Sequence, residues 1–196
     1  MTKKESKEKR IEDIIDAAVN VFVDKGYENT TMSEIAEQAG ISKGGLYHHF
    51  LSKDMVMLYA NQKLMEPCND MLFKAKQNTS ACEGLKKYIF EYIGYWTQRK
   101  KELIFFSLSM AKAMTHMDIF KLYEKYVEDY ISSVEALFKK GIDSDEFIMH
   151  DPRGSAISLI SALDGVTIYM TLDKKMKLED ISNYFIDRLI EPIIKK

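Results

Sequence analysis

The side chains best suited to chemistry lie in one stretch, Thr31 to Phe50, which reads TMSEIAEQAGISKGGLYHHF. Its hydroxyl, amine and imidazole groups can donate hydrogen bonds to phosphates and to the edges of bases. The chain shows no Ser/His/Asp order, phosphate-binding glycine loop or paired-carboxylate motif. His48 and His49 are adjacent, so they project differently, and neither has a carboxylate or cysteine at helical spacing. We therefore expect nucleic-acid binding, with no catalytic residue, no metal site and no cofactor.

The spacing of residues in this stretch predicts two short helices joined by a turn. Thr31 and Glu34 have the spacing of a capping box, and Gly40 suits a left-handed turn between the helices. Small or apolar residues form the predicted inner side: Ile35, Ala36, Ile41, Leu46 and Phe50. The outer face of the second helix then carries Ser42, Lys43, Gly44, Tyr47 and His48. A helix-turn-helix of this kind places the first residues of its second helix in the major groove.

The remaining sequence predicts an all-α fold. The 196 residues include only three prolines and nine glycines, and no segment alternates apolar and polar residues as a half-buried strand does. Nine helices are expected: one from about residue 6 to Gly26, the two of the motif, and six longer ones over about 53–76, 80–99, 101–115, 118–140, 152–172 and 178–194. Gly141 is expected to end the seventh of them. Because the helices lengthen after the motif, we expect a helix-turn-helix domain over 1–52 and a larger helical domain over 53–196.

Charge does not by itself indicate a nucleic-acid partner. The chain has 28 Lys+Arg against 30 Asp+Glu, and residues 1–53 contain eight basic and nine acidic residues, a net charge of 8 − 9 = −1. Five basic residues nevertheless cluster at the N-terminus: Lys3, Lys4, Lys7, Lys9 and Arg10. This arm is expected either to lie along a phosphate backbone or to be a solvated, frayed terminus.

A composite of short motifs over about residues 11–54 resembles the tetracycline-repressor-type (TetR) family of bacterial transcriptional regulators. The matching segments are Gly26-Tyr27, Thr31-Met32-x-x-Ile35-Ala36, Ala39-Gly40-Ile41-Ser42-Lys43-Gly44 and Leu46-Tyr47-His48-His49-Phe50-x-Ser52-Lys53. The resemblance implies that DNA is contacted from the positions of Thr31, Ser42, Lys43, Gly44, Tyr47, His48 and Lys53. It also implies a homodimer in which the last two long helices of each subunit form a four-helix bundle, so that two reading helices meet a palindromic operator.

The larger domain is predicted to hold either a packed core or a ligand cavity. Aromatic residues at helical spacing are typical of a core, whereas tyrosines together with flexible methionines can also line an adaptable pocket. The candidate ligand-binding residues are Tyr88, Tyr92, Trp96, Phe106, Met110, Tyr123, Tyr126 and Asp164. Asp164 interrupts an apolar helix, so it could select a cationic ligand, make a polar contact at a subunit interface or lie on an exposed edge of the helix.

We expect a transcriptional repressor that a small apolar or cationic ligand releases from its operator. The alternative is a DNA-binding helical protein without a small-molecule effector, acting through a protein partner. Met1 to Arg10 lacks the apolar core of a secretory signal, and Asp164 interrupts the longest apolar stretch, so no membrane segment is expected. Cys68 and Cys82 are too few for a disulfide framework, which favours the cytoplasm.

Overall fold

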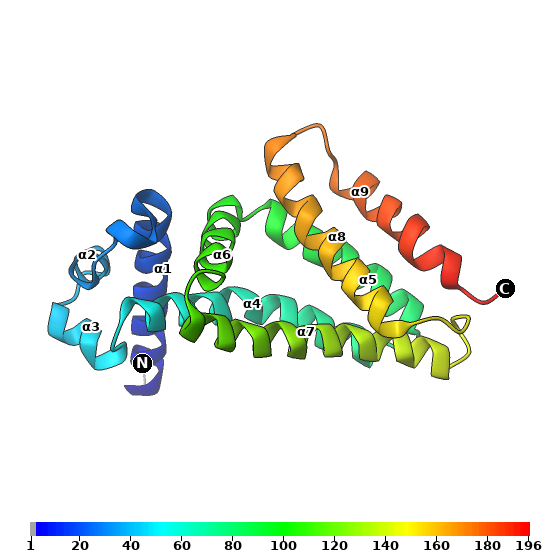
Figure 1. The fold of residues 1–196 in the computed structure, drawn as a ribbon, viewed down its shortest axis with the longest axis horizontal. Coiled ribbons are helices and arrows are strands. Elements are labelled where there is room, and N and C mark those ends of the chain that lie inside the picture. Colours follow the sequence, from blue (N-terminus) through cyan, green and yellow to red (C-terminus); the bar gives the residue numbers. More distant parts are fainter. Residues whose placement is uncertain (1–2) are drawn as a thin grey trace. The chain divides into compact units, whose positions relative to one another are not determined.

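The computed structural model describes the backbone of residues 3–196 and the side chains of residues 8–116, 121 and 123–196. The described chain is all-α, as predicted, apart from one isolated β-bridge between Phe147 and Ile194 (Figure 1). Its helices are α1 (Lys3–Asn29), α2 (Met32–Gln38), α3 (Lys43–His49), α4 (Lys53–Gln77), α5 (Ala81–Thr97), α6 (Lys100–Ala113), α7 (Met117–Asp143), α8 (Pro152–Leu172) and α9 (Leu178–Phe185). A π-helical turn, η1 (Ile186–Ile190), and a 3₁₀ turn, η2 (Glu191–Ile193), follow α9.

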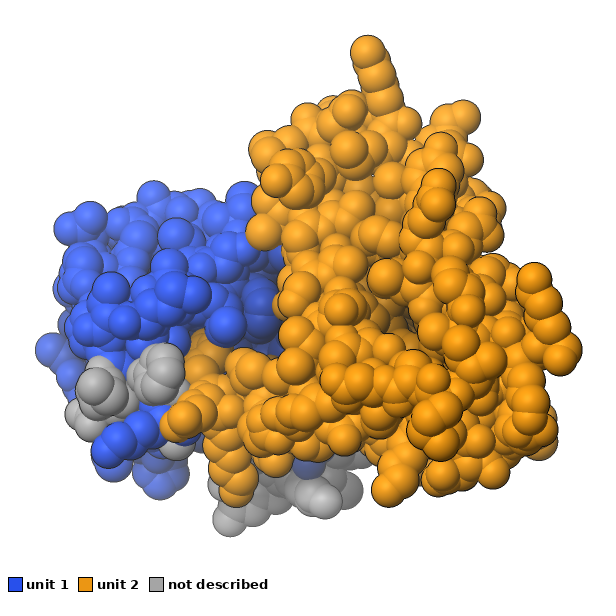
Figure 2. Space-filling model, turned by 45° about the vertical axis from the view of Figure 1, so that its right-hand side comes forward, with its two compact units in different colours: residues 1–65, 101–122 blue, residues 66–100, 123–196 orange. Residues whose placement is uncertain are grey.

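These elements form two compact units (Figure 2). Unit 1 contains residues 1–65 and 101–122, and unit 2 contains residues 66–100 and 123–196. Unit 1 therefore combines α1, α2 and α3 with the first half of α4 and nearly all of α6. The chain passes between the units within α4, at the start of α6 and within α7. The expected domain boundary after residue 52 stays a prediction.

The core of unit 1 joins the helix-turn-helix to α1. Ile14 and Ala18 of α1, Ile35 of α2 and Leu46 of α3 have almost no accessible surface. Burying a side chain the size of isoleucine or leucine stabilises a fold by about 1.5–3 kcal/mol, so these contacts hold two seven-residue helices that would not form alone. Gly26 has the predicted left-handed backbone, with φ of 75°, and interrupts α1 there even though helical hydrogen bonding resumes up to Asn29.

The core of unit 2 is built around α5. Leu85, Ile89 and Ile93 are fully buried along it, and α5 contacts both α8 and α9. Ser80 caps α5 by accepting a hydrogen bond from the amide of Glu83 at 3.1 Å, as expected. The amide of Ser80 itself donates to Oδ1 of Asn78 at 3.1 Å, and a distant carboxylate, that of Glu146 after α7, accepts from the next two amides, those of Ala81 and Cys82.

Two expected helix ends are wrong. Gly141 does not end α7, which continues to Asp143. Gly141 instead allows the Phe147 ring to pack closely against α7. A Cβ at position 141 would lie 2.1 Å from Cδ2 of Phe147. The last expected helix, over about 178–194, is α-helical only to Phe185 and continues as η1 and η2. Pro192, which cannot donate a helical hydrogen bond, lies within η2.

Helix α8 is long and apolar enough to pass a membrane-span test on length and composition, and 28% of its most apolar window is buried. Asp151 caps its first turn by accepting from the amide of Arg153, and Pro152 occupies the position where a missing amide costs nothing. The core helix of a soluble protein can have the same length and composition.

Candidate nucleic-acid interface

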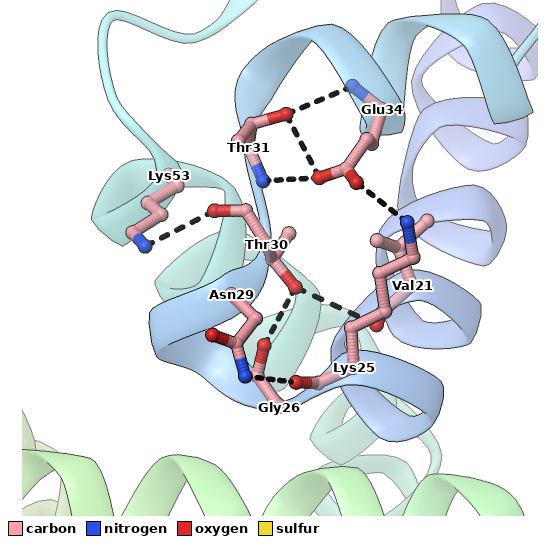
Figure 3. A network of polar contacts seen from close by, with 8 residues as sticks. All are labelled: Val21, Lys25, Gly26, Asn29, Thr30, Thr31, Glu34 and Lys53. Carbon is pink, nitrogen blue, oxygen red and sulfur yellow. Dashed lines mark hydrogen bonds and ion pairs between the residues drawn. The ribbon is translucent and has the colours of Figure 1, made fainter.

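The turn into α2 is held by the predicted capping box. The Thr31 hydroxyl accepts from the amide of Glu34 at 3.3 Å, and the Glu34 carboxylate accepts from the amide of Thr31 at 2.8 Å (Figure 3). Lys25 of α1 pairs with the same carboxylate at 2.5 Å. Hydrogen bonds from Lys25 and Thr31 lower the pKa of Glu34 to about 2, so this anchor stays ionised at neutral pH.

The second helix of the motif, α3, presents the predicted residues to solvent. Its N-cap, Ser42, accepts from the amide of Gly45 at 3.0 Å, and Gly40 supplies the left-handed turn before it, with φ of 64°. The exposed residues are Ser42, Lys43, Gly44, Tyr47 and His48. Since Leu46 is fully buried beneath them, the helix is fixed by one face while the opposite face stays open to a partner.

Gly44 and Tyr47 define the shape of this open face. A Cβ built at Gly44 would meet nothing within 4 Å, and Tyr47 keeps 41% of its surface exposed. The Lys43 ammonium lies over the Tyr47 ring, 6.0 Å from its centroid. A cation, a phenol and a bare backbone segment thus share one turn of helix, which allows contacts to phosphates and a close approach to base edges.

Two of the residues expected at DNA already have partners within the protein. Thr31 is engaged by Glu34, as described above. Lys53, at the start of α4, donates from Nζ to the carbonyls of Tyr27 at 2.8 Å, Glu28 at 3.3 Å and Thr30 at 3.1 Å. Figure 3 shows the Lys53 side chain turned toward Thr30. Lysine in this position satisfies carbonyls left free at the end of a helix, which is a structural role for Lys53.

The N-terminal arm is helical rather than extended, because α1 begins at Lys3. Lys9 and Arg10 are on exposed turns of α1. The side chains of Lys3, Lys4 and Lys7 lie outside the part of the structure that is described, so the expectations for them remain predictions.

With this geometry in view, the comparisons with known proteins decide the class of the molecule. Residues 14–60, which span the helix-turn-helix, match the family described as bacterial regulatory proteins, tetR family. The helix-turn-helix region is therefore similar to TetR-type DNA-binding domains, and the chain is a DNA-binding transcriptional regulator. It is 25% identical over 186 residues to the fatty acid metabolism regulator protein of Bacillus subtilis (strain 168), covering 93% of this chain and 95% of that protein.

Two further relatives place the regulator among proteins of related architecture. Over 81 residues, 41% of this chain and 44% of the relative, it is 31% identical to the biofilm operon icaADBC HTH-type negative transcriptional regulator IcaR of Staphylococcus aureus (strain Newman). The crystal structure of the transcriptional regulator FadR from Bacillus subtilis in complex with stearoyl-CoA superposes with a TM-score of 0.76 at 23% identity, covering 93% of this chain and 98% of that one. At that identity the superposition establishes the fold.

Most of the regulator's candidate ligand residues are core residues. Tyr88, Tyr92 and Trp96 of α5 and Tyr123 of α7 are buried, with 5% or less of their surface accessible. Tyr126 is half-buried and Asp164 is exposed. These six belong to unit 2, whereas Phe106 and Met110 belong to unit 1. The eight residues therefore do not form one cluster within a single unit.

Two hydrogen-bonded pairs nevertheless involve these residues in unit 2. Tyr92 donates a hydrogen bond to Asp164 at 2.6 Å, and the hydroxyls of Tyr88 and Tyr130 are hydrogen-bonded to each other. The Tyr126 hydroxyl is buried without a partner. Desolvation by the surrounding protein raises the pKa of Asp164, and the hydrogen bond from Tyr92 opposes this shift. Part of the Asp164 residue nevertheless remains accessible to solvent. These hydrogen bonds are polar contacts that the predicted ligand-binding residues make within unit 2.

Sequence reasoning missed three residues of the regulator that make long-range contacts. Lys112 of α6 is almost fully buried and pairs with Glu28. Partial burial alone would raise the pKa of Glu146, but hydrogen bonds from Ser80 and the amides of Ala81 and Cys82 lower it to about 2. Tyr130 pairs with Tyr88. Their partners lie 42 to 84 residues away, so no local spacing could have revealed them.

Proposed function

We propose that this regulator is a cytoplasmic repressor that binds a palindromic operator as a homodimer and is released by a small-molecule effector. The open face of α3 carries this proposal. Lys43 and Tyr47 supply a cation and a hydroxyl for the DNA, and Gly44 allows the helix to approach the base edges closely. Ser42 and His48 border this face, while Thr31 and Lys53 support it from within the protein and would reach phosphates only by exchanging their present partners.

Footprinting on DNA flanking the regulator's own coding region, at two salt concentrations, tests the DNA-binding surface. Lys43→Ala and Tyr47→Ala should each weaken protection about tenfold, and Lys43→Ala should reduce the slope of log affinity against log salt by about one. Lys101→Ala is the matched control, because Lys101 is an exposed lysine of α6. Unchanged binding by the Lys43→Ala, Tyr47→Ala double variant would refute the assignment of α3.

The effector is proposed to bind within unit 2 as an apolar molecule, with a long-chain acyl-CoA thioester as the first candidate. A relative's crystal structure contains stearoyl-CoA, and the buried residues of unit 2 are mainly aromatic and aliphatic, which suits contact with an acyl chain. No cationic side chain of the described chain shifts the pKa of Asp164. A free carboxylate would therefore be repelled there, whereas a neutral thioester would not; a cation would be attracted.

Three probes distinguish these ligand classes by their effect on fluorescence anisotropy of a labelled operator. Stearoyl-CoA should release the operator, stearate should do so at much higher concentration, and coenzyme A alone should have no effect. Release by a long-chain quaternary ammonium ion, lost in Asp164→Asn, would instead identify a cationic effector. If no probe shifts operator binding, the protein-partner alternative is favoured.

The homodimer is proposed to form through α8 and the segment from α9 to η2. Ile157, Ile168 and Leu172 are exposed apolar residues of α8, and Tyr184 of α9 is 62% exposed. Exposed apolar patches of this kind mark protein interfaces. Helix α4 begins beside α3 and continues into unit 2 without a break, so we propose that it carries the effector's influence to the reading helices.

A further inference from the structure

Two ammonium groups converge on one aromatic ring in unit 1. Nζ of Lys53 and Nζ of Lys112 each lie over the Tyr27 ring, 4.3 Å from its centroid. Lys53 comes from the start of α4, Lys112 from the last turn of α6, and Tyr27 from the residues that follow the break in α1. The Tyr27 hydroxyl is also hydrogen-bonded to Asp54. Three distant segments thus meet at a single side chain.

Lys112 is the unusual member of this group. Only 8% of its side chain is accessible, and burying a lysine is costly unless its charge is compensated. The compensation comes from the Glu28 carboxylate, with which it forms an ion pair, and from the face of the Tyr27 ring. Hydrogen bonding to Lys112 in turn lowers the pKa of Glu28. This buried ammonium favours a single arrangement of Lys112, Glu28 and Tyr27, because moving one of them away would leave the charge unpaired.

The rest of the same face of α6 is fixed to unit 1 as well. The Phe105 ring packs 5.8 Å from the Phe22 ring of α1, and the Ser109 hydroxyl donates to Oδ1 of the buried Asn61 of α4 at 2.9 Å. Phe105, Ser109 and Lys112 are spaced by four and three residues, which places them on one side of the helix. Helix α6 is therefore bound to α1 and α4 over two turns, and Lys112, in its last turn, contacts Tyr27 and Glu28, which precede the N-cap of α2.

The corner that Lys112 holds determines how α2 and α3 are oriented. Residues 27–30 lead directly to Thr31, the N-cap of α2, and their carbonyls are tied by Lys53, which follows the end of α3. The entry to α2 and the exit from α3 are thus joined at this corner. A change in the position of Tyr27 or Glu28 would move both ends of the helix-turn-helix together.

We propose that Lys112, acting through Tyr27 and Glu28, is a positioning residue that sets the angle of the reading helices and hence the half-site spacing that the dimer accepts. This inference rests on the proposed binding of a palindromic operator by a dimer. Lys112 does not touch DNA in this assignment; it selects among operators by restricting the geometry of α3. Loss of its charge leaves the helix-turn-helix folded but free to adopt other angles.

The test measures spacing preference, which a merely structural role would not change. An operator is first selected from random duplexes with the wild-type protein, and duplexes with one base pair added to or removed from its centre are then compared. Lys112→Met should bind the selected operator about fivefold more weakly, and should reduce the ratio of affinities between selected and altered spacing at least threefold. Loss of folded protein alone lowers all affinities equally and leaves that ratio unchanged.

Matched variants distinguish the effect of the Lys112 charge from that of the Tyr27 ring and from a general loss of stability. Lys112→Arg should restore the spacing ratio because it keeps the cation, and Lys101→Met, which removes an exposed charge from the same helix, should leave the ratio at the wild-type value. Tyr27→Phe keeps the ring beneath the cations and should retain most of the ratio, whereas Tyr27→Leu should lose it. If Lys112→Met does not fold, the comparison of Tyr27→Phe with Tyr27→Leu tests the proposal instead.

A wild-type spacing ratio in Lys112→Met and Tyr27→Leu would overturn the proposal, whatever their overall affinities. A different failure would refute its premise: if the wild-type protein selects no palindrome, or binds all spacings equally, the proposed dimeric operator binding is wrong and the positioning role falls with it.

Discussion

At the scale of single residues, side chains of similar type divide into those open to a partner and those already used by the fold. Lys43 and Lys53 flank the same short helix, yet Lys43 is exposed while Lys53 binds three carbonyls of the segment that ends α1. From the sequence, a lysine at the start of α4 is equally suited to bind a DNA phosphate or the free carbonyls at the end of a helix. Only the positions of its acceptors distinguish the two roles.

The role of Lys53 predicts a stability effect. Lys53→Met should lower the free energy of unfolding by about 1–2 kcal/mol, because three carbonyls lose a charged donor. Chemical denaturation measures this loss, and Lys43→Met, which removes an exposed charge nearby, should leave stability within about 0.5 kcal/mol of wild type. An unchanged unfolding midpoint together with a shallower salt dependence of DNA binding would instead make Lys53 a phosphate contact.

Asp164 predicts a pH dependence with a defined sign. Desolvation raises its folded-state pKa, so folding favours the protonated acid, and the favourable contribution is lost as pH rises through the raised pKa. Asp164→Asn removes the charge and keeps an oxygen that can accept from Tyr92. The variant should match wild type below about pH 3, where both folded and unfolded acids are protonated, and should be the more stable protein at pH 7.

Urea unfolding at several pH values checks this prediction. Cys68, Tyr126 and Tyr130 also lie close enough to interact with Asp164, but each remains protonated over this range because burial raises its pKa. A variant that is less stable than wild type at pH 7 would mean that the carboxylate gains more from its surroundings than burial costs it.

At the scale of elements, local signals were read from the sequence correctly wherever both partners are close in the chain. The capping box of α2 joins Thr31 and Glu34, three residues apart, and Gly40 has the left-handed backbone that its place between the two short helices predicts. Sequence reasoning failed where the partner is distant. Glu146 accepts from the amide of Ala81, 65 residues away, and Lys112 reaches α1 across 84 residues.

Gly141 illustrates the same limit and makes a prediction. A glycine after a basic turn predicts a helix end, but here it serves close packing inside α7 against Phe147. Gly141→Ala should cost about 1–3 kcal/mol, because its Cβ would overlap a buried ring that has little room to move. Thermal unfolding measures the loss. Gly165→Ala in α8 is the control, since a Cβ there meets nothing within 4 Å, and it should not destabilise the chain.

A substitution at Gly44 of α3 is expected to raise stability while lowering operator affinity. Because its Cβ position is open and alanine is the better helix former, Gly44→Ala should stabilise the protein by about 0.5 kcal/mol. The added methyl would stand on the face proposed to enter the groove, so operator affinity should fall by roughly tenfold. Thermal unfolding and anisotropy titration of the same preparation measure both effects. Unchanged operator affinity would show that DNA does not approach this turn.

At the scale of the whole molecule, one apolar helix remains largely uncovered in the single chain. Ile157, Ser161, Asp164, Ile168 and Leu172 follow α8 at intervals of four and three residues and are all exposed or nearly so. Such a stripe is longer and more apolar than solubility favours. Its small residue, Ser161, would allow a second helix to approach closely. A two-fold axis would let the same stripe of a second copy cover it.

Ile168→Arg should therefore convert the dimer to a monomer, because each copy would bring a long charged side chain into the interface where an apolar one packs. Sedimentation equilibrium measures the change in mass. Operator protection should shrink to one half-site, with affinity reduced by at least a hundredfold, because the second reading head no longer binds intramolecularly. Phe73→Arg places the same charge at a 62% exposed aromatic residue of α4 and should leave the dimer intact. If Ile168→Arg stays dimeric while Phe73→Arg dissociates, the interface lies on α4, and the spacing of the reading helices must be set from there.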